Sequence, residues 1–248
     1  PDHFAAHDAT QMASFLSDAE LALNGVAMRY YTDPGFKLGA FTHPDLSVRK
    51  AALDITKQGI DVCAAMGGKT VTLWMGQDGF DYAFQMDYAA AWDRTIETIS
   101  ELCAHNLAID IAIEYKPNEP RAYALMPDIG TTLLACKEVN APNLGVTLDF
   151  AHVLYADEMP AHSAALIGRH SRMIGLHLND GYGKRDDGLM VGSVHAIQTV
   201  ELLVAMLRMN QTDVIYFDTF PDMGGLNPIE EARTNVALTD RLMDIAEV

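Results

Sequence analysis

The sequence predicts an α/β fold, a (β/α)8 TIM barrel of which this chain contains the last six βα units. Short apolar runs rich in β-branched residues alternate with longer segments of helical period, which is typical of a parallel sheet with helical crossovers. The units repeat roughly every 30 to 45 residues, as barrel units do. A chain of 248 residues with 49% hydrophobic content can bury a core of this size.

Six segments are expected to form the strands. Each is apolar at nearly every position, as a strand covered on both faces must be. In chain order they are residues 22–29, 70–75, 108–114, 144–149, 173–178 and 214–218.

Capping residues indicate where the intervening helices begin and end. A helix over residues 47–66 stops at Gly67, and one over 87–105 stops at Asn106. The last helix opens with Asn227 as cap and Pro228 at its first position. The helix over 194–209 is expected to pack on the sheet through one stripe, formed by Ile197, Val200, Leu203, Val204 and Leu207.

The number of units falls two short of a closed barrel. We therefore expect residues 1–248 to form a single barrel domain that is incomplete at its N-terminus. An open six-stranded α/β sheet has the same pattern and remains an alternative.

Composition excludes several classes of partner. The net charge of −17 repels a polyphosphate backbone, so nucleic acid is not expected to bind. No apolar run reaches the roughly 20 residues of a membrane span, and the first residues do not resemble a signal peptide. Cys63, Cys103 and Cys136 lie in apolar helical stretches without a CxxC pair, which indicates buried thiols and a cytoplasmic protein.

Four polar residues fall at the carboxyl ends of successive predicted strands, the end where barrel active sites are built: Glu114, Asp149, His177 and Asp218. Three carboxylates brought together would repel one another unless a cation lay between them. Oxygen ligands with one nitrogen favour Mn²⁺, or Mg²⁺ or Co²⁺, over a structural zinc site. Each acidic residue alone could equally cap a helix or pair with a base, but four in register favour a metal site.

Four more residues are candidates for binding a substrate. Lys116 follows Glu114 by two positions, and His152 follows Asp149 by three, so both could enter the same pocket. Asp186 lies in a glycine-rich polar loop after His177 that could fold back over the metal, although such a loop is also typical of a solvated turn. Trp74 ends a predicted strand, where it would offer an apolar wall to a sugar. A tryptophan at this position could equally belong to the core.

These residues together resemble the xylose isomerase-like TIM-barrel superfamily of sugar isomerases and epimerases. Glu114-Tyr115-Lys116 is similar to the family's Glu-x-Lys on the fifth strand, and Asp149 with His152 to the acid-x-x-His of the sixth. His177 then matches the metal histidine of the seventh strand, as in the L-rhamnose isomerase and xylose isomerase branch. Asp218 matches the aspartate of the eighth.

The resemblance implies a sugar substrate and a metal held by Glu114, Asp149, His177 and Asp218. Lys116 and Asp218 would act with Glu114 in catalysis. The family's isomerases add an Asp-x-Asp pair for a second metal, but here Asp186 is followed two positions later by Gly188. One metal is therefore expected more firmly than a second.

The activity implied by this resemblance is interconversion of an aldose and a ketose by a metal-assisted hydride shift between C1 and C2. The related 3-epimerases use glutamate on both the fifth and eighth strands, whereas the eighth-strand residue here is Asp218. A ketose 3-epimerase, a sugar dehydratase and a non-catalytic sugar- or metal-binding barrel remain alternatives. An endonuclease for abasic DNA shares the barrel but needs more histidines and a basic face. Family members are commonly dimers or tetramers, so a homo-oligomer is expected.

Overall fold

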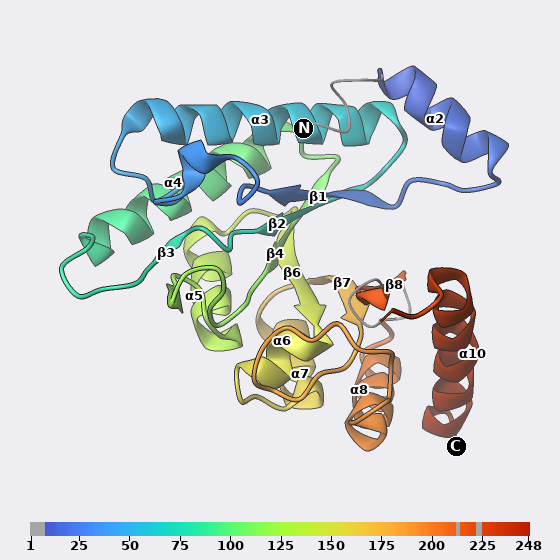
Figure 1. The fold of residues 1–248 in the computed structure, drawn as a ribbon. Helices are drawn as coiled ribbons and strands as arrows, with labels where there is room; N and C mark the ends of the chain where they lie inside the picture. Colours follow the sequence, from blue (N-terminus) through green and yellow to red (C-terminus); the bar gives the residue numbers. More distant parts are fainter. Residues whose placement is uncertain (1–7, 212–213, 222–224) are drawn as a thin grey trace. The chain divides into compact units, whose positions relative to one another are not determined.

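The computed structural model describes residues 8–211, 214–221 and 225–248. Its elements alternate between strand and helix, and six strands join one sheet in the order β1-β2-β4-β6-β7-β8 (Figure 1). The registered pairs β1–β2, β2–β4, β6–β7 and β7–β8 are all parallel. This confirms the predicted α/β class and the strand–helix order of a TIM barrel.

Each strand lies within a predicted segment, at most three residues shorter at either end. The six strands are β1 (Gly25–Arg29), β2 (Thr70–Trp74), β4 (Asp110–Glu114), β6 (Leu144–Asp149), β7 (Met173–Leu178) and β8 (Ile215–Phe217). The chain divides into two compact units, which are described separately. The first holds β1, β2, β4 and the start of β6; the second holds the rest of β6 with β7 and β8.

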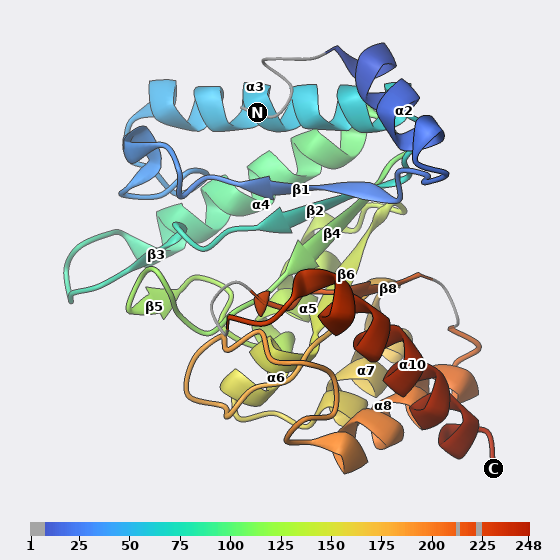
Figure 2. The same cartoon turned by 45° about the vertical axis from the view of Figure 1, so that its right-hand side comes forward.

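In the first unit, α3 (Leu46–Ala65) and α4 (Tyr88–His105) lie beside each other along the strands, and α2 (Ala9–Asp18) contacts α3 (Figure 2). Contacts made by β1 and by the residue after it explain how α3 packs against the strands. Met28 and Tyr30 are buried toward α3, where the Tyr30 hydroxyl lies 2.7 Å from Thr56 Oγ1. Gly59 of α3 has no room for a Cβ, which would come 2.6 Å from the Met28 sulfur. The absent side chain therefore lets helix and strand approach closely.

Two short strands that the sequence analysis did not predict link the loops of the first unit. β3 (Gly79–Phe80) and β5 (Tyr123–Ala124) pair antiparallel, and the Phe80 and Tyr123 rings stack with centroids 5.1 Å apart. The buried Arg121 fixes this arrangement by donating to Asp81 Oδ2 at 2.9 Å and to the Gln77 carbonyl at 3.2 Å. A short 3-10 helix, η1 (Pro34–Phe36), completes the loop after β1.

In the second unit, α8 packs between α7 and α10. Its helices are α6 (Phe150–Tyr155), α7 (Pro160–His170), α8 (Ala196–Arg208) and α10 (Pro228–Ala246), and α5 (Ile129–Val139) is shared with the first unit. As predicted, Asn227 caps α10 by accepting from the N–H groups of Ile229 and Glu230, with Pro228 at the first position.

The predicted buried stripe of α8 was wrong in most of its members. Of the five residues expected there only Leu203 is buried, and Ile197 is 83% exposed. The buried face is Thr199, Leu202, Leu203 and Met206. Apolar residues cover more than half of the circumference of this helix, so periodicity alone does not determine which part of that broad face is buried.

The three cysteines are buried, as predicted, and no disulfide joins them. Burial raises the pKa of the Cys103 thiol to about 12, so it stays protonated. Among the described residues, no helix is both long enough and apolar enough to cross a membrane.

Candidate metal centre

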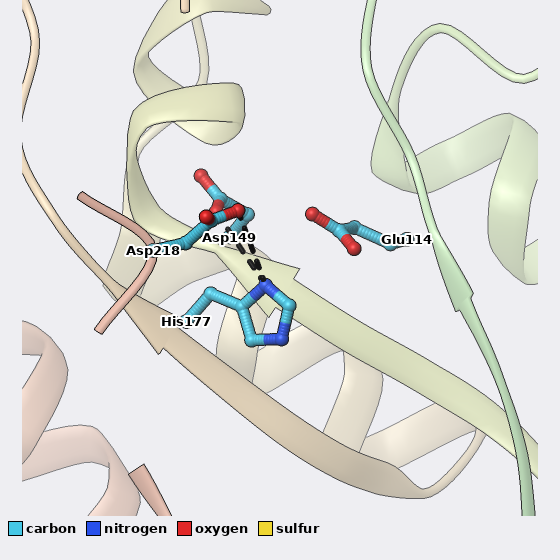
Figure 3. A group of neighbouring side chains, drawn as sticks. All are labelled: Glu114, Asp149, His177 and Asp218. Atoms are coloured by element: carbon cyan, nitrogen blue, oxygen red, sulfur yellow. Dashed lines mark ion pairs between the residues drawn. The ribbon is translucent and has the colours of Figure 1, made fainter. Parts of the chain in front are cut away.

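The structure brings together the four residues that end successive strands. Glu114 is the last residue of β4 and Asp149 the last of β6; His177 lies in β7, and Asp218 follows β8. Each offers one ligand atom, and these atoms all lie within 4.8 Å of one another (Figure 3). They converge because the carboxyl ends of parallel strands meet at the same edge of the sheet.

Their chemistry fits a divalent cation. The set contains three carboxylates and one imidazole, and Glu114 and Asp149 are buried. Such charges stay ionised together only if a positive charge lies among them. Hard divalent ions prefer oxygen ligands, and one nitrogen is compatible with Mn²⁺, Co²⁺ or Zn²⁺.

The neighbouring imidazoles keep Asp149 ionised. Burial alone would raise the pKa of its carboxyl group, but His152 and His177 hold this pKa below its ordinary value. Nδ1 of His177 lies 3.7 Å from Asp149 Oδ2 and 3.9 Å from Asp218 Oδ2, and dashed lines in Figure 3 mark these ion pairs. An anionic Asp149 is the form that a metal requires.

Asn179, which the sequence analysis did not single out, fixes the orientation of this carboxylate. It is fully buried, and its Nδ2 lies 3.2 and 3.1 Å from the two carboxylate oxygens of Asp149 and 3.0 Å from the carbonyl oxygen of Asp218. Its own oxygen accepts from the N–H of Ala151 at 2.8 Å. Its place two residues after His177 is the signal that could have identified it. A single amide therefore joins two of the four candidate ligands.

A second polar cluster contains three residues predicted to contact substrate, Lys116, His152 and Asp186. Nζ of Lys116 lies 3.1 Å from Asp186 Oδ2, and Nε2 of His152 lies 3.1 Å from the same oxygen. Against the effect of burial, His152 and Lys116 lower the pKa of Asp186 to about 2. The cluster is therefore a carboxylate held between two donors, with the ammonium group of Lys116 almost fully buried.

Two other carboxylates of the loop that contains Asp186 fix the conformation of this loop. Asp180 accepts from the N–H groups of Val194 and His195 at 2.8 Å each. Asp187 accepts from Arg185 Nε at 2.7 Å and from the N–H of Tyr182 at 2.8 Å. Asp186 is thus the acidic residue of this loop that contacts Lys116 and His152.

Gly188 lies where the resemblance places the second aspartate of an Asp-x-Asp pair. Its φ is +55°, and a Cβ built on it would come 2.3 Å from Cδ2 and 2.4 Å from Cγ of Phe220. The N–H of Phe220 also donates to the Gly188 carbonyl at 2.9 Å. The Phe220 ring therefore covers the position that a side chain at residue 188 would occupy.

Trp74, predicted to bind substrate, ends β2 directly beside Glu114 in the register of the sheet. Side chains at matched positions of neighbouring parallel strands point to the same face. The Tyr31 ring meets the indole edge-on with centroids 5.4 Å apart. Gly76 also adjoins the indole, since a Cβ there would come 2.5 Å from Trp74 Cη2. The orientation of Trp74 is thereby fixed by packing.

A family model described as xylose isomerase-like TIM barrel matches residues 2–242. The chain belongs to this family. The match covers nearly the whole sequence and agrees with the observed parallel strand order. It confirms the superfamily that the sequence resembles, whereas the isomerase branch remains a prediction.

Several solved structures have a similar fold. A D-tagatose 3-epimerase-like protein has a TM-score of 0.80 and 18% identity, over 97% of this chain and 84% of the other. An L-ribulose 3-epimerase has a TM-score of 0.78 and 14% identity, over 97% and 81%. The IOLI protein with a binding zinc atom has a TM-score of 0.74 and 16% identity, over 99% and 85%. At such identities the likeness establishes the fold.

Proposed function

We propose that this chain is a divalent-metal-dependent sugar isomerase that interconverts an aldose and a ketose by a metal-assisted hydride shift between C1 and C2. The observation that supports it most is the buried ammonium group of Lys116, which lies two residues after Glu114 and 3.1 Å from Asp186. A fixed cation beside a metal centre suits a reaction in which negative charge develops on a sugar oxygen. The family and the fold are compatible with this activity.

The metal ligands in this proposal are Glu114, Asp149, His177 and Asp218. The ion, Mn²⁺ or else Mg²⁺ or Co²⁺, would supply Lewis acidity toward the substrate oxygens. Zinc bound to the IOLI protein is compatible with a divalent ion on this fold. Glu114 and Asp218 have a catalytic role because they would hold the ion toward which the reacting end of the sugar is oriented.

The remaining residues bind and orient the sugar. Lys116 directs its ammonium group at the C1 oxygen and stabilises the charge that develops there. His152 and Asp186 orient each other through the contact of Nε2 with Oδ2, and together they would hold a hydroxyl group or a water molecule of the substrate complex. Trp74, fixed by Tyr31 and Gly76, supplies an apolar wall that excludes water from the sugar.

A ketose 3-epimerase is the second candidate, because the similar structures include proteins named as 3-epimerases. The resemblance implies that such enzymes transfer protons between glutamates on the fifth and eighth strands. Here the eighth-strand residue is Asp218, whose carboxyl group lies one methylene closer to the backbone. This shorter reach, together with Lys116, favours the isomerase. A sugar dehydratase or a non-catalytic sugar- or metal-binding barrel would use the same ligand set.

Other properties follow the same proposal. The partner is a small sugar, and the net charge of −17 opposes nucleic acid. We also predict that the chain forms a single barrel domain and acts in carbohydrate metabolism in the cytoplasm. It is expected to form a homo-oligomer, either a dimer or a tetramer.

A panel of aldoses and ketoses, run in D₂O with added Mn²⁺ and followed by NMR, tests this proposal. An isomerase using a hydride shift converts a ketose into an aldose with no deuterium bound to carbon, because the hydrogen moves directly between C1 and C2. A 3-epimerase instead yields a second ketose with deuterium at C3. That second pattern, or no conversion of any sugar by metal-loaded protein, would contradict the isomerase.

A further inference from the structure

The second polar cluster already contains its own cation. Oδ2 of Asp186 accepts from Lys116 Nζ and lies within hydrogen-bond distance of His152 Nε2, both at 3.1 Å. The ammonium group of Lys116 balances the charge of this carboxylate. A dication bound to Asp186 would have to lie near that ammonium group, where two positive charges repel strongly because water is largely excluded.

The loop also lacks a further carboxylate that could offset this repulsion. Asp187 is paired with Arg185 and with the N–H of Tyr182. Residue 188 is glycine, and the root of the Phe220 ring lies 2.3 to 2.4 Å from the point where a Cβ would stand. Cγ is the ring atom bonded to Cβ of Phe220, so a contact below 3.0 Å with it cannot be relieved by a small rotation of the ring. The backbone and Phe220 together therefore exclude an acidic side chain at residue 188.

We propose that this centre takes one divalent ion, that the ammonium group of Lys116 supplies the second positive charge, and that Phe220 prevents a second acidic ligand by filling the space of a side chain at residue 188. The inference rests on the proposed metal centre and extends it to the number of ions. It assigns Phe220, which has no charge and is no ligand, a role in determining metal stoichiometry.

The arrangement leaves one polar atom for the substrate. Oδ1 of Asp186 is buried and has no hydrogen-bond partner among the described residues. A buried carboxylate oxygen without a donor costs free energy, which a hydroxyl group of a bound sugar would recover. In a single-ion centre Asp186 is thus an acceptor for substrate, oriented by Lys116 and His152, and no metal ligand.

Metal stoichiometry of the full chain tests the inference. Purified protein is titrated with Mn²⁺ by calorimetry, and the electron paramagnetic resonance spectrum of the loaded protein is recorded, because two neighbouring Mn²⁺ ions couple magnetically. The expected result for the unaltered chain is about one ion without coupling. Two coupled ions would overturn the inference alone. The absence of any bound ion would overturn the proposed metal centre and the inference with it.

Variants at residues 188 and 220 test whether Phe220 limits the number of bound ions. The double variant Gly188→Asp with Phe220→Ala restores both the carboxylate and the space, and aspartate tolerates a positive φ better than most residues. We expect it to bind a second ion, whereas Gly188→Asp alone and Phe220→Ala alone keep the stoichiometry of the unaltered chain. Thermal unfolding verifies that each variant is folded. A second ion in Gly188→Asp alone, or none in the folded double variant, would contradict the role of Phe220.

Discussion

Nζ of Lys116 lies 3.1 Å from Oδ2 of Asp186, 70 positions away in the chain, and both groups are largely buried. This pair joins residue 116 to the loop after β7 within the second compact unit. Lys116 therefore both orients the carboxylate of Asp186 and presents a positive charge at the proposed substrate position.

Replacing Lys116 by methionine, which keeps most of the side-chain volume, is expected to lower kcat by about 100-fold or more. The bound metal should remain, because Lys116 is not one of the four ligands. Steady-state kinetics and metal analysis check both results. Lys184→Met, at an exposed position of the loop after β7, is the matched control and should retain activity. A Lys116→Met variant that is as active as the unaltered chain would exclude a catalytic role.

Replacing Asn179 by alanine removes three donor contacts to Asp149 and Asp218 without removing a metal ligand. Loss of such an outer partner typically lowers metal affinity by about 10- to 100-fold. Calorimetric titration with Mn²⁺ measures the change, and the exposed Asn24→Ala serves as control. An affinity equal to that of the unaltered chain would mean that Asn179 stabilises the fold without orienting the ligands.

A methyl group at residue 76 is expected to displace the indole of Trp74, because its Cβ would stand 2.5 Å from Cη2. Gly76→Ala should lower kcat/KM by about 10- to 100-fold through misplacement of the sugar. It should also change the tryptophan fluorescence, to which only two tryptophans contribute. Gly130→Ala is the control, since its Cβ would meet only Asp128 Oδ1 at 3.4 Å. A fluorescence change with unaltered kinetics would remove Trp74 from the substrate site.

Asp78 should make stability depend on pH. Burial raises the pKa of its carboxyl group, although donors from Thr42 and Ala40 oppose the shift. A folded-state pKa above the unfolded value contributes stability that is complete below about pH 4 and is lost as pH rises through the folded-state pKa. Asp78→Asn keeps an acceptor for these donors and cannot ionise. Its free energy of unfolding relative to the unaltered chain should therefore rise with pH above about 4.

Urea denaturation of both proteins at a series of pH values measures this difference. Asp45→Asn is the control with the opposite sign, because hydrogen bonds from Ser47 lower the pKa of Asp45. Stability from Asp45 is present above about pH 4 and is lost on further acidification. A constant difference between Asp78→Asn and the unaltered chain across the series would contradict the buried ionisation of Asp78.

The strands and the grouping of the four candidate ligands could be predicted because they depend on local pattern. A run such as Leu144–Asp149, apolar until its final carboxylate, identifies both a buried strand and its carboxyl end. The convergence of four such ends is expected where parallel strands curve into a barrel. The pair β3–β5 could not be predicted, because two-residue strands have no periodicity.

The contacts between distant residues could not be predicted from the sequence. Asn179 is visible two residues after His177, but its bonds to Asp149 and Asp218 depend on how two strand ends meet. Gly188 stands out as a departure from the family's pattern. Only the fold reveals that the Phe220 ring fills the space beside it.

The most direct test of the proposed metal-dependent isomerase is the metal content of the purified chain, measured together with Mn²⁺-dependent conversion of a ketose to an aldose. The measurement compares the unaltered chain, Glu114→Gln, and Glu101→Gln, an exposed residue of α4. We expect the unaltered chain and Glu101→Gln to retain the ion and turnover, and Glu114→Gln to lose both, with a drop in metal affinity exceeding about 100-fold. Full metal content and full activity in Glu114→Gln, or a metal-free unaltered chain with the same activity, would contradict the proposal.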